Sequence, residues 1–386
     1  MKRILLNFSI LLGLVVVSCD NADLSQEQNA INDNSLTQRQ SSMFSYIEST
    51  QINNGVDCKN NILIFPTWEK YWETIEVLDQ MIENDCNSFD ATVPNNITDD
   101  QYDALADAAG FDEDNVLRKF EEDLAFCSLR RKIEILENDW LDQQGDGQWD
   151  INADPDNHFI DDETERTLLS QNVEVIIGDK KNGYVYYKFI DDEGSRIEVH
   201  NNDTQAISQV SQGIIPTNNS NVVVVKPKEE NNSGTCKSKV KEVAYEVSGG
   251  DRLKRISKIR RESGIKFSST GNVSTSIFKS KIKAKTKGYR KKNGKWRCRR
   301  TWITAGLDGY DIYSTGNGFD TCNDAIEINK FKEKRRRRVK VKRTIDTFVG
   351  VLSDIHYFTV QNDKLFSFHK KGNLIINKDF YDMPIN

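Results

Sequence analysis

The chain has 386 residues, of which 37% are hydrophobic and 9% aromatic, a composition typical of a globular protein long enough for two domains. Beyond its N-terminal segment, no stretch approaches the roughly 20 apolar residues of a transmembrane helix, which excludes a polytopic membrane protein. The net charge of −6 hides an asymmetry, because residues 20–210 carry −29 and residues 211–386 carry +21. Such a split predicts either an anionic partner for the basic half or electrostatic contact between the halves.

The N-terminus has the pattern of a bacterial lipoprotein signal. Two basic residues precede an apolar run over residues 10–17, and Val16-Val17-Ser18-Cys19 fits the lipobox. We predict that residues 1–18 are a signal peptide and that Cys19 carries the lipid that anchors the protein to the membrane. The alternative is an uncleaved membrane anchor, but the apolar run is shorter than a span of about 20 residues.

Residues 19–42 are predicted to be a lipidated, disordered tether, because no aromatic residue or hydrophobic period follows the cysteine. Asp20, Asn21 and Asp23 resemble the signal that exports lipoproteins of the Bacteroidota to the cell surface. An ordinary polar linker is the alternative. We therefore expect an outer-membrane lipoprotein of the cell envelope, on either the periplasmic or the surface-exposed face.

Residues 43–200 are predicted to form an acidic α+β domain. A strand is expected at 62–65, and Pro66-Thr67 then begin a helix with a tryptophan-rich apolar face. Thr98 and Gln101 form a capping-box pair before a short helix that ends at Gly110.

The next helix is expected to run unbroken from about Asp114 to Leu141, since apolar residues spaced three and four apart continue through it. An acidic loop, residues 142–163, follows this helix. The hydrophobic period then changes to two, which predicts strands at 173–177, 184–190 and 196–200.

The C-terminal part is predicted to be all β. Residues 201–237 are rich in Asn, Ser and Gln and predict an interdomain linker. In residues 238–386, turn signals such as SGGD, KKNG and KKGN separate many short strands, which indicates a basic all-β domain, sandwich- or barrel-like. The predicted fold class is thus an α+β N-terminal domain followed by an all-β C-terminal domain.

Six cysteines remain after Cys19, namely Cys58, Cys86, Cys127, Cys236, Cys298 and Cys322. An even number of cysteines in an exported chain predicts disulfides. Each half holds three, so full pairing needs a bridge between the halves; otherwise one thiol in each half stays free. None lies in a CxxC motif, so a zinc site is not expected.

Three segments resemble a group of uncharacterised cell-envelope lipoproteins of the Bacteroidota, whose function is unknown. They are ILIFPTWEKYWETIEVL, DPDNHFIDDETERTLL followed by EVIIGD, and KTKGYRKKNGKWRCRRTW. The resemblance covers most of the mature chain. It implies a location and an architecture and assigns no active site.

The acidic loop begins with the oxygen spacing of a calcium-binding loop. Gly147 stands at the sixth position, where a sharp turn is needed. A glutamine replaces one carboxylate, and Ala153 stands where a bidentate glutamate is expected, so a solvated loop is the alternative. Ca²⁺ is therefore a candidate cofactor, with the ligands Asp142, Gln144, Asp146, Asp150 and Asp154.

A basic hairpin is the predicted binding surface. Asn293-Gly294 is a strong signal for a two-residue turn. Counting outward from this turn pairs Lys292 with Lys295, Lys291 with Trp296, Tyr289 with Cys298, Lys287 with Arg300 and Lys285 with Trp302. We predict that Lys285, Lys287, Trp296, Arg300 and Trp302 share a face that binds an anionic polymer, with Ile282, Ala284 and Ile303 on the other face. The alternative is an exposed strand whose lysine stems cover the tryptophan rings.

The basic run from Lys330 to Arg343 predicts a strand with one very positive face, which could join the hairpin in one electropositive surface. The alternative is a solvated strand that repels neighbouring chains.

Signals of catalysis are poor. The sequence has no GxSxG, HExxH, P-loop or GxGxxG motif, and its four histidines are scattered. An acid–base pair could come from Asp154, Asp156, Asp161, Asp162 and Glu163, but on one polar loop we expect them to be solvated. We therefore predict that the protein is not an enzyme and has no small-molecule substrate.

Together these features predict a lipoprotein with a non-enzymatic binding or assembly role. Its basic β domain would contact an anionic partner, such as a glycan, lipopolysaccharide or nucleic acid. The alternative is a structural lipoprotein whose basic domain docks on acidic protein surfaces, including its own N-terminal domain. A hydrolase is the remaining alternative.

Overall fold

The computed structural model describes residues 43–51, 58, 61–191, 195–225, 237, 239–248, 251–267, 273–315, 324–349 and 356–384. The predicted signal peptide, Cys19 and the tether lie outside this part of the chain. Tyr46–Asn386 belong to one compact unit. Within the described residues, no helix is long and apolar enough to cross a membrane.

Six strands form the N-terminal sheet, in the order β1-β2-β3-β4-β5-β6. They are β1 (Glu48–Gln51), β2 (Asn61–Phe65), β3 (Glu174–Asp179), β4 (Gly183–Phe189), β5 (Arg196–Val199) and β6 (Val222–Val225). The strands predicted at 62–65, 173–177, 184–190 and 196–200 are confirmed. Strands β2 and β3 pair in parallel, whereas the other neighbours are antiparallel. A parallel pair needs a long crossover, and here it contains helices and the acidic loop.

Helices α2 (Trp68–Asp90) and α3 (Asp99–Ala108) begin at the predicted caps. The Thr67 side chain accepts a hydrogen bond from the backbone N–H of Lys70. Thr98 and Gln101 form both hydrogen bonds of a capping box. Gly110 has a φ of 63°, a left-handed conformation that suits glycine after a helix end.

The predicted unbroken helix over 114–141 is wrong, because two helices, α4 (Asn115–Asp123) and α5 (Leu129–Asp142), take its place. Ala125 adopts a φ of 46°, which ends the first helix. The buried Ser128 side chain then accepts from the backbone N–H of Arg131 and caps the second helix. No glycine or proline marks this break, so the apolar spacing conceals it.

Helices α6 (Glu163–Leu168) and α7 (Thr204–Ser211) complete the helical part. Helix α7 and strand β6 both lie within the segment 201–237 that the sequence predicts as a linker. The apolar face of α7 packs on the N-terminal sheet, with Ala206, Ile207 and Val210 in the same core cluster as Ile62 and Ile176.

Two five-stranded sheets follow. One, here called the basic sheet, contains β7 (Val240–Ser248), β8 (Asp251–Phe267), β9 (Val273–Lys292), β10 (Lys295–Cys298) and β13 (Arg338–Val349). The other, the outer sheet, contains β11 (Thr301–Thr315), β12 (Asp324–Arg336), β14 (His356–Thr359), β15 (Leu365–Lys371) and β16 (Leu374–Asp379). An apolar core joins the two faces, with Ile282 and Val341 from the basic sheet and Ile303 and Leu365 from the outer one. This is a sandwich arrangement, and the fold as a whole is mixed α and β with mostly strands.

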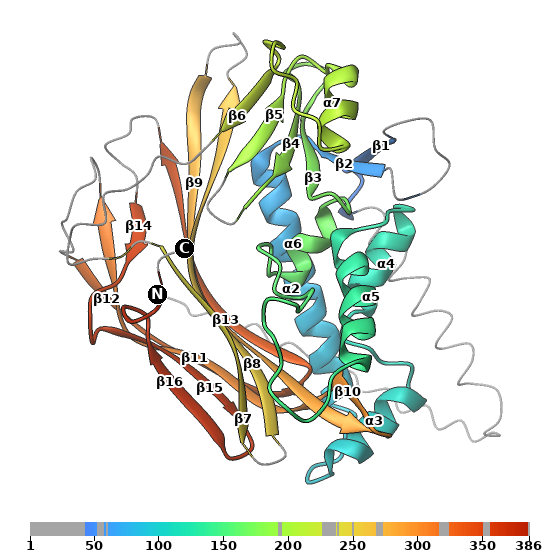
Figure 1. Ribbon diagram of the computed structural model, residues 1–386, viewed down its shortest axis with the longest axis vertical. Coiled ribbons are helices and arrows are strands. Elements are labelled where there is room, and N and C mark those ends of the chain that lie inside the picture. Colours follow the sequence, from blue (N-terminus) through green and yellow to red (C-terminus); the bar gives the residue numbers. More distant parts are fainter. Residues whose placement is uncertain are drawn as a thin grey trace, which may run out of the picture. The chain divides into compact units, whose positions relative to one another are not determined.

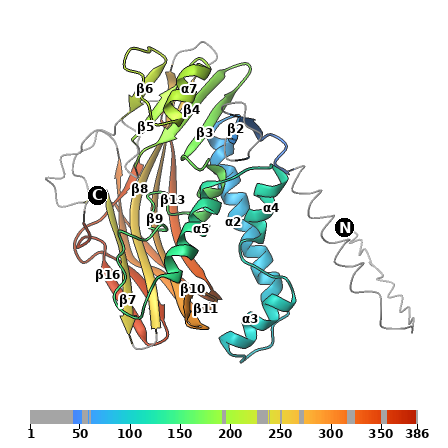
Figure 2. The ribbon, with the colours of Figure 1, turned by 45° about the vertical axis from the view of Figure 1, so that its right-hand side comes forward.

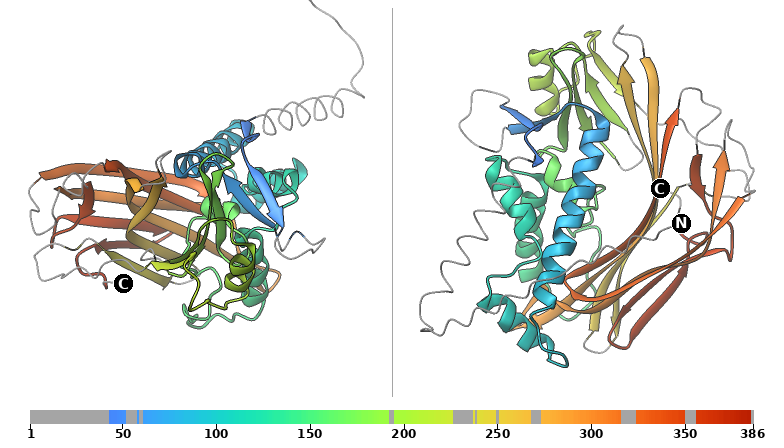
Figure 3. Two further views of the ribbon diagram at one scale, coloured as in Figure 1. Left: turned by 90° about the horizontal axis from the view of Figure 1, so that it is seen from above. Right: turned by 180° about the vertical axis from the view of Figure 1, so that it is seen from behind.

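Helices α2 and α5 lie along the face of the basic sheet that points away from the outer sheet, as Figures 1 and 2 show. Figure 3 shows the same order from behind, with α2 beside the sheets. An aromatic cluster fixes α5 and the acidic loop to this face, because Leu141 and Trp149 pack against Tyr245, Tyr289 and Trp296. The helices and the acidic loop of the acidic half therefore pack directly on one face of the basic sheet.

Candidate functional site: a buried ion-pair interface

The face of the basic sheet that points away from the sandwich core carries rows of cations. Because Ile282 of β9 packs in the core, Lys285 and Lys287, three and five residues later, lie on the opposite face. The ladder places Lys287 between Lys254 of β8 and Arg338 of β13. Like charges facing each other across strands destabilise a sheet, so this arrangement requires anions above it.

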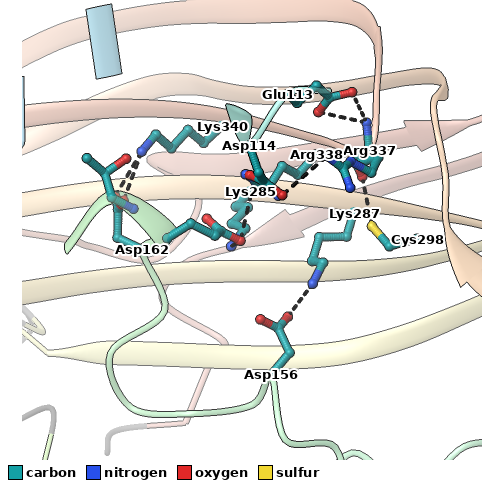
Figure 4. A network of polar contacts seen from close by, with 12 residues as sticks. Glu113, Asp114, Asp156, Asp162, Lys285, Lys287, Cys298, Arg337, Arg338 and Lys340 are labelled. Carbon is teal, nitrogen blue, oxygen red and sulfur yellow. Dashed lines mark hydrogen bonds and ion pairs between the residues drawn. The ribbon is translucent and has the colours of Figure 1, made fainter. Parts of the chain in front are cut away.

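The acidic loop and α6 supply these anions at the centre of the sheet. The Nζ atoms of Lys254 and Lys287 lie 2.9 and 2.8 Å from Asp156 Oδ2, the second of these contacts being drawn in Figure 4. Lys285 Nζ donates to Glu163 Oε1 at 2.6 Å. All five side chains are buried. The acidic loop and the start of α6 thus cover the lysine rows with carboxylates that pair with them.

Arg166 of α6 contacts the same carboxylate. Its Nη1 lies 2.6 Å from Asp156 Oδ1, and its Nε donates to the carbonyl of Ile160. Asp156 therefore accepts from three cations, Arg166, Lys254 and Lys287. A buried carboxylate with several charge-assisted partners has its lone pairs satisfied, which offsets part of its desolvation cost.

Two further groups extend the interface along β13. Arg338 pairs with Asp114 beside the start of α4, and the backbone N–H of Arg337 donates to Glu113 at 3.0 Å (Figure 4). Lys340 Nζ lies 3.0 Å from Asp162 and 2.8 Å from Asp79 of α2. We call these contacts, with those around Asp156, the ion-pair interface.

Neighbouring cations hold Asp156 and Glu163 in their charged form. Burial alone would raise the pKa of Asp156, but Lys254 and Lys287 outweigh it and hold that pKa well below its usual range. The same balance, with Lys285 as the main cation, lowers the pKa of Glu163 to about 2. Burial raises the pKa of Glu137, which Lys287 opposes only in part. At neutral pH the carboxylates of Asp156 and Glu163, at the centre of the interface, are therefore charged.

The predicted register of the hairpin is correct near its turn and wrong farther out. Lys292 pairs with Lys295, Lys291 with Trp296, and Tyr289 with Cys298. Strand β10 ends at Cys298, and β13 takes the place beside β9, so Lys287 faces Arg338 and Lys285 faces Lys340. Trp302 instead belongs to β11 of the outer sheet and faces Arg335.

The five residues predicted to bind a polymer are not brought together on an open face. Lys285 and Lys287 are buried under the acidic loop, and Trp296 is buried in the aromatic cluster. Arg300 is buried and donates to the carbonyl of Phe111. Trp302 is 52% exposed and lies on the other sheet. The predicted open face was wrong because acids of the N-terminal half cover it.

The basic run 330–343 forms two strands, β12 and β13, separated at Arg337. Strand β13 pairs with β9, so its cations do join those of the hairpin strand on one face. That face is covered by α2 and the acidic loop, since Lys342 contacts Glu76 and Asp79 of α2 and Lys340 contacts Asp162. It is therefore not a solvated strand.

The five acids expected to be solvated, Asp154, Asp156, Asp161, Asp162 and Glu163, are all buried. This expectation was wrong because each of the five acids has a lysine of the basic sheet within ion-pairing distance. The alternation of apolar and basic residues in β9 was the available signal for this interface, because it indicates one face that packs in the core and one face of cations that needs anionic partners.

The candidate calcium ligands do not converge. Asp142 lies 2.6 Å from Arg297, Asp146 lies 2.9 Å from Lys291, and Asp154 lies 2.6 Å from Lys254. Gln144 donates to the Trp140 carbonyl, and Asp150 accepts from the backbone N–H of Asn152. Across the described residues, no group of three His, Cys, Asp or Glu side chains could hold a metal ion.

One predicted disulfide is present, between Cys58 and Cys127. It joins the segment after β1 to the turn before α5, both in the acidic half. Cys86 and Cys298 are free thiols, and burial raises the pKa of each to about 12. Cys236 and Cys322 lie outside the described residues.

No family model and no curated protein matches this chain. Among solved structures, a crystal structure of a DUF4848 family protein from Bacteroides thetaiotaomicron is similar at 12% identity, with a TM-score of 0.18. The match covers 85% of this chain and 96% of that chain. It is too distant to assign this chain to that family.

Proposed function

We propose that the protein is a non-enzymatic, structural lipoprotein of the cell envelope whose basic sheet docks on its own acidic half. The observation that carries this proposal is the burial of the central lysines. Lys254, Lys285 and Lys287 are 0%, 1% and 3% exposed, and each donates to a carboxylate of the acidic half. Cations so buried are out of reach of an external polymer.

This proposal favours the docking alternative over polymer binding. A polyanion site needs cations that can release counterions to solvent, and the hairpin lysines are already neutralised within the protein. The cell-envelope location rests on the lipobox that ends at Cys19, and the non-enzymatic role rests on the lack of a catalytic motif.

The test is retention of the soluble mature protein, residues 20–386, on heparin and on DNA resin at low salt. We expect no retention that depends on the central lysines. Lys285→Ala should elute with the unmodified protein, because the buried Lys285 does not reach the resin, whereas the control Lys292→Ala removes an exposed cation and should lower any residual retention. Strong retention of the unmodified protein that falls in Lys285→Ala but not in Lys292→Ala, with Lys285→Ala still folded by circular dichroism, would contradict the proposal.

A further inference from the structure

The outer sheet has a face that points away from the sandwich core and carries half-exposed apolar side chains. Ile303 and Leu307 of β11 pack in the core, so the alternate residues of this strand lie on the opposite face. Helices α2 and α5 lie on the basic sheet instead, as Figure 1 shows. Four large apolar side chains on the opposite face are 47–58% exposed, namely Trp302 and Tyr310 of β11, Phe331 of β12 and Ile375 of β16. We call this surface the aromatic face, and an exposed patch of this kind is typical of a binding surface.

The centre of the aromatic face is a pair of phenylalanine rings above a glycine. The strand pairing places Gly306 of β11 between Phe331 of β12 and Phe368 of β15. The two rings meet edge to face over Gly306, with their centroids 5.6 Å apart. A Cβ atom at position 306 would collide with the Phe331 ring, so glycine is the residue that leaves room for this pair. The sheet is therefore shaped to hold the rings at its surface.

Trp302 is held from one side only. The guanidinium carbon of Arg335 lies 5.2 Å from the centroid of the Trp302 ring, and Arg335 Nε lies 2.9 Å from Asp99. A cation over an aromatic ring is attracted to it and limits its orientation. The tryptophan remains 52% exposed, so it presents an oriented ring surface to a ligand.

The charges of the aromatic face do not suit a polyanion. Lys370 Nζ lies 3.3 Å from Glu333 and is thereby neutralised within the face. Asp308 and Glu327 are exposed acids, and no ion pair is found for either among the described residues. Lys364 is an exposed cation at the same end of the face. Without an excess of positive charge, the face offers an anionic polymer little counterion release.

Polar side chains stand beside the rings. Asn329 and Asp308 face each other across β12 and β11, two residues from Phe331 and Gly306, and Asn377 pairs with Phe368. These three polar side chains are exposed, and none of them forms a hydrogen bond within the part of the chain that the structure describes. Covering them with an apolar protein surface would leave polar groups unsatisfied, which is costly. A polyhydroxylated ligand supplies donors and acceptors for them, while its C–H groups meet the electron-rich faces of the rings.

We propose that the aromatic face binds a neutral polysaccharide. Sugar rings stack on Trp302, Phe331 and Tyr310, and sugar hydroxyls pair with the polar side chains between them. Trp302, Gly306 and Tyr310 follow one another at intervals of four residues along β11, about 13 Å each, so an extended chain of sugars reaches all three positions. This function goes beyond the structural role proposed above, because the aromatic face lies on the other sheet and uses none of the pairs of the ion-pair interface.

The test is isothermal titration calorimetry of the soluble mature protein with three neutral polysaccharides: laminarin, pullulan and yeast mannan. Polygalacturonate is the anionic counterpart. We expect saturable binding of at least one neutral polysaccharide, unchanged at high salt, and weaker binding of polygalacturonate. Trp302→Ala and Phe331→Ala should each weaken the affinity by about three- to tenfold, as loss of one ring contact does. Ile135→Ala is the matched control, because Ile135 is 54% exposed but lies on α5, and its affinity should be unchanged.

Four results would overturn the proposal. They are no binding of any of the three neutral polysaccharides, tighter binding of polygalacturonate, unchanged affinity in both ring variants, or a dimer that Phe331→Ala dissociates, which would assign the aromatic face to a second copy of the chain. If one ring variant does not melt cooperatively, the other variant and the comparison of the four polysaccharides on the unmodified protein decide. None of these results depends on the buried lysines, so the structural proposal is tested separately.

Discussion

Lys254 Nζ lies 2.6 Å from Asp154 Oδ2, and both side chains are completely buried although 100 residues separate them in the chain. Tyr245 donates to the same carboxylate oxygen at 2.7 Å. Replacing both members of such a pair by apolar groups is often tolerated, but removing one leaves an uncompensated buried charge. Each half therefore needs the charges of the other half to stay folded, because either one alone would leave buried charges without partners.

Asp156→Asn should destabilise the protein strongly, because it leaves Arg166, Lys254 and Lys287 with less compensation. Breaking a buried ion pair costs about 3–5 kcal/mol, and we expect a loss of that size in the free energy of unfolding in urea. Asp150→Asn is the matched control, since Asp150 is exposed and accepts only from the nearby backbone N–H of Asn152. Equal stability of the two variants would contradict the interface.

Acid should unfold the protein in a defined pH range. The pKa of Glu163 falls from 4.5 to about 2 on folding, and the pKa of Asp156 also falls. A carboxyl whose pKa is lower in the folded state stabilises the protein above its unfolded pKa, and this contribution is lost as the pH falls through the folded pKa. The raised pKa of Glu137 acts in the opposite direction and offsets part of the effect.

The free energy of unfolding should therefore decrease as the pH falls from 4.5 to about 2. Urea titrations at a series of pH values measure this dependence. Glu163→Gln should flatten it, because the amide does not titrate. A profile of Glu163→Gln parallel to that of the parent protein would show that Glu163 is not held in its charged form.

Cys86 and Cys298, the free thiols among the described residues, should resist alkylation in the folded protein. The thiolate is the reactive form, and burial raises the pKa of Cys86 and of Cys298 to about 12. With iodoacetamide at pH 8, peptide mass spectrometry should find both unmodified until urea is added. Cys58 and Cys127 should be modified only after reduction. Rapid labelling of Cys298 without urea would indicate that β10 does not hold it as described.

Ser128→Ala should test the break between α4 and α5. Its hydroxyl caps α5 and also donates to the buried Glu121. Loss of a serine cap costs about 1 kcal/mol, and Glu121 Oε1 also loses one hydrogen bond while keeping that from Arg130 Nε, so we expect a loss of about 1–2 kcal/mol. Ser88→Ala is the control, because Ser88 is exposed in the last turn of α2 and its hydroxyl donates to the Asn84 carbonyl of the same helix. A loss no larger than in Ser88→Ala would argue for a continuous helix.

Local patterns in the sequence predict much of this fold. The caps at Thr67 and Thr98, the four strands β2 to β5 of the N-terminal sheet and the register around Asn293-Gly294 depend on neighbouring residues and were predicted correctly, whereas β1 and β6 were not predicted. The break at Ala125 was not predicted, since its positive φ has no local marker in the chain.

The candidate site could not be predicted from local patterns of this kind. The alternation of β9 correctly separates Ile282 from Lys285, but it cannot say whether the cationic face meets water or acids. Lysine is rarely buried, so solvent is the natural expectation. The partner Glu163 lies 122 residues away, beyond any local pattern. The opposite net charges of the two halves were the long-range signal, and they point to docking as readily as to an external partner.

The crossover between β2 and β3 sets an order of events during synthesis. Asp79 of α2 contacts Lys340, which is made 261 residues later, so the acidic half leaves the ribosome long before its counterions exist. Its carboxylates must stay hydrated in the nascent chain. Water can leave the layer between helices and sheet only after β13 has been synthesised. A chain stopped before that strand would expose a strongly acidic, half-built surface. Packing of the helices on the basic sheet is thus a late step of folding that depends on the last third of the polypeptide.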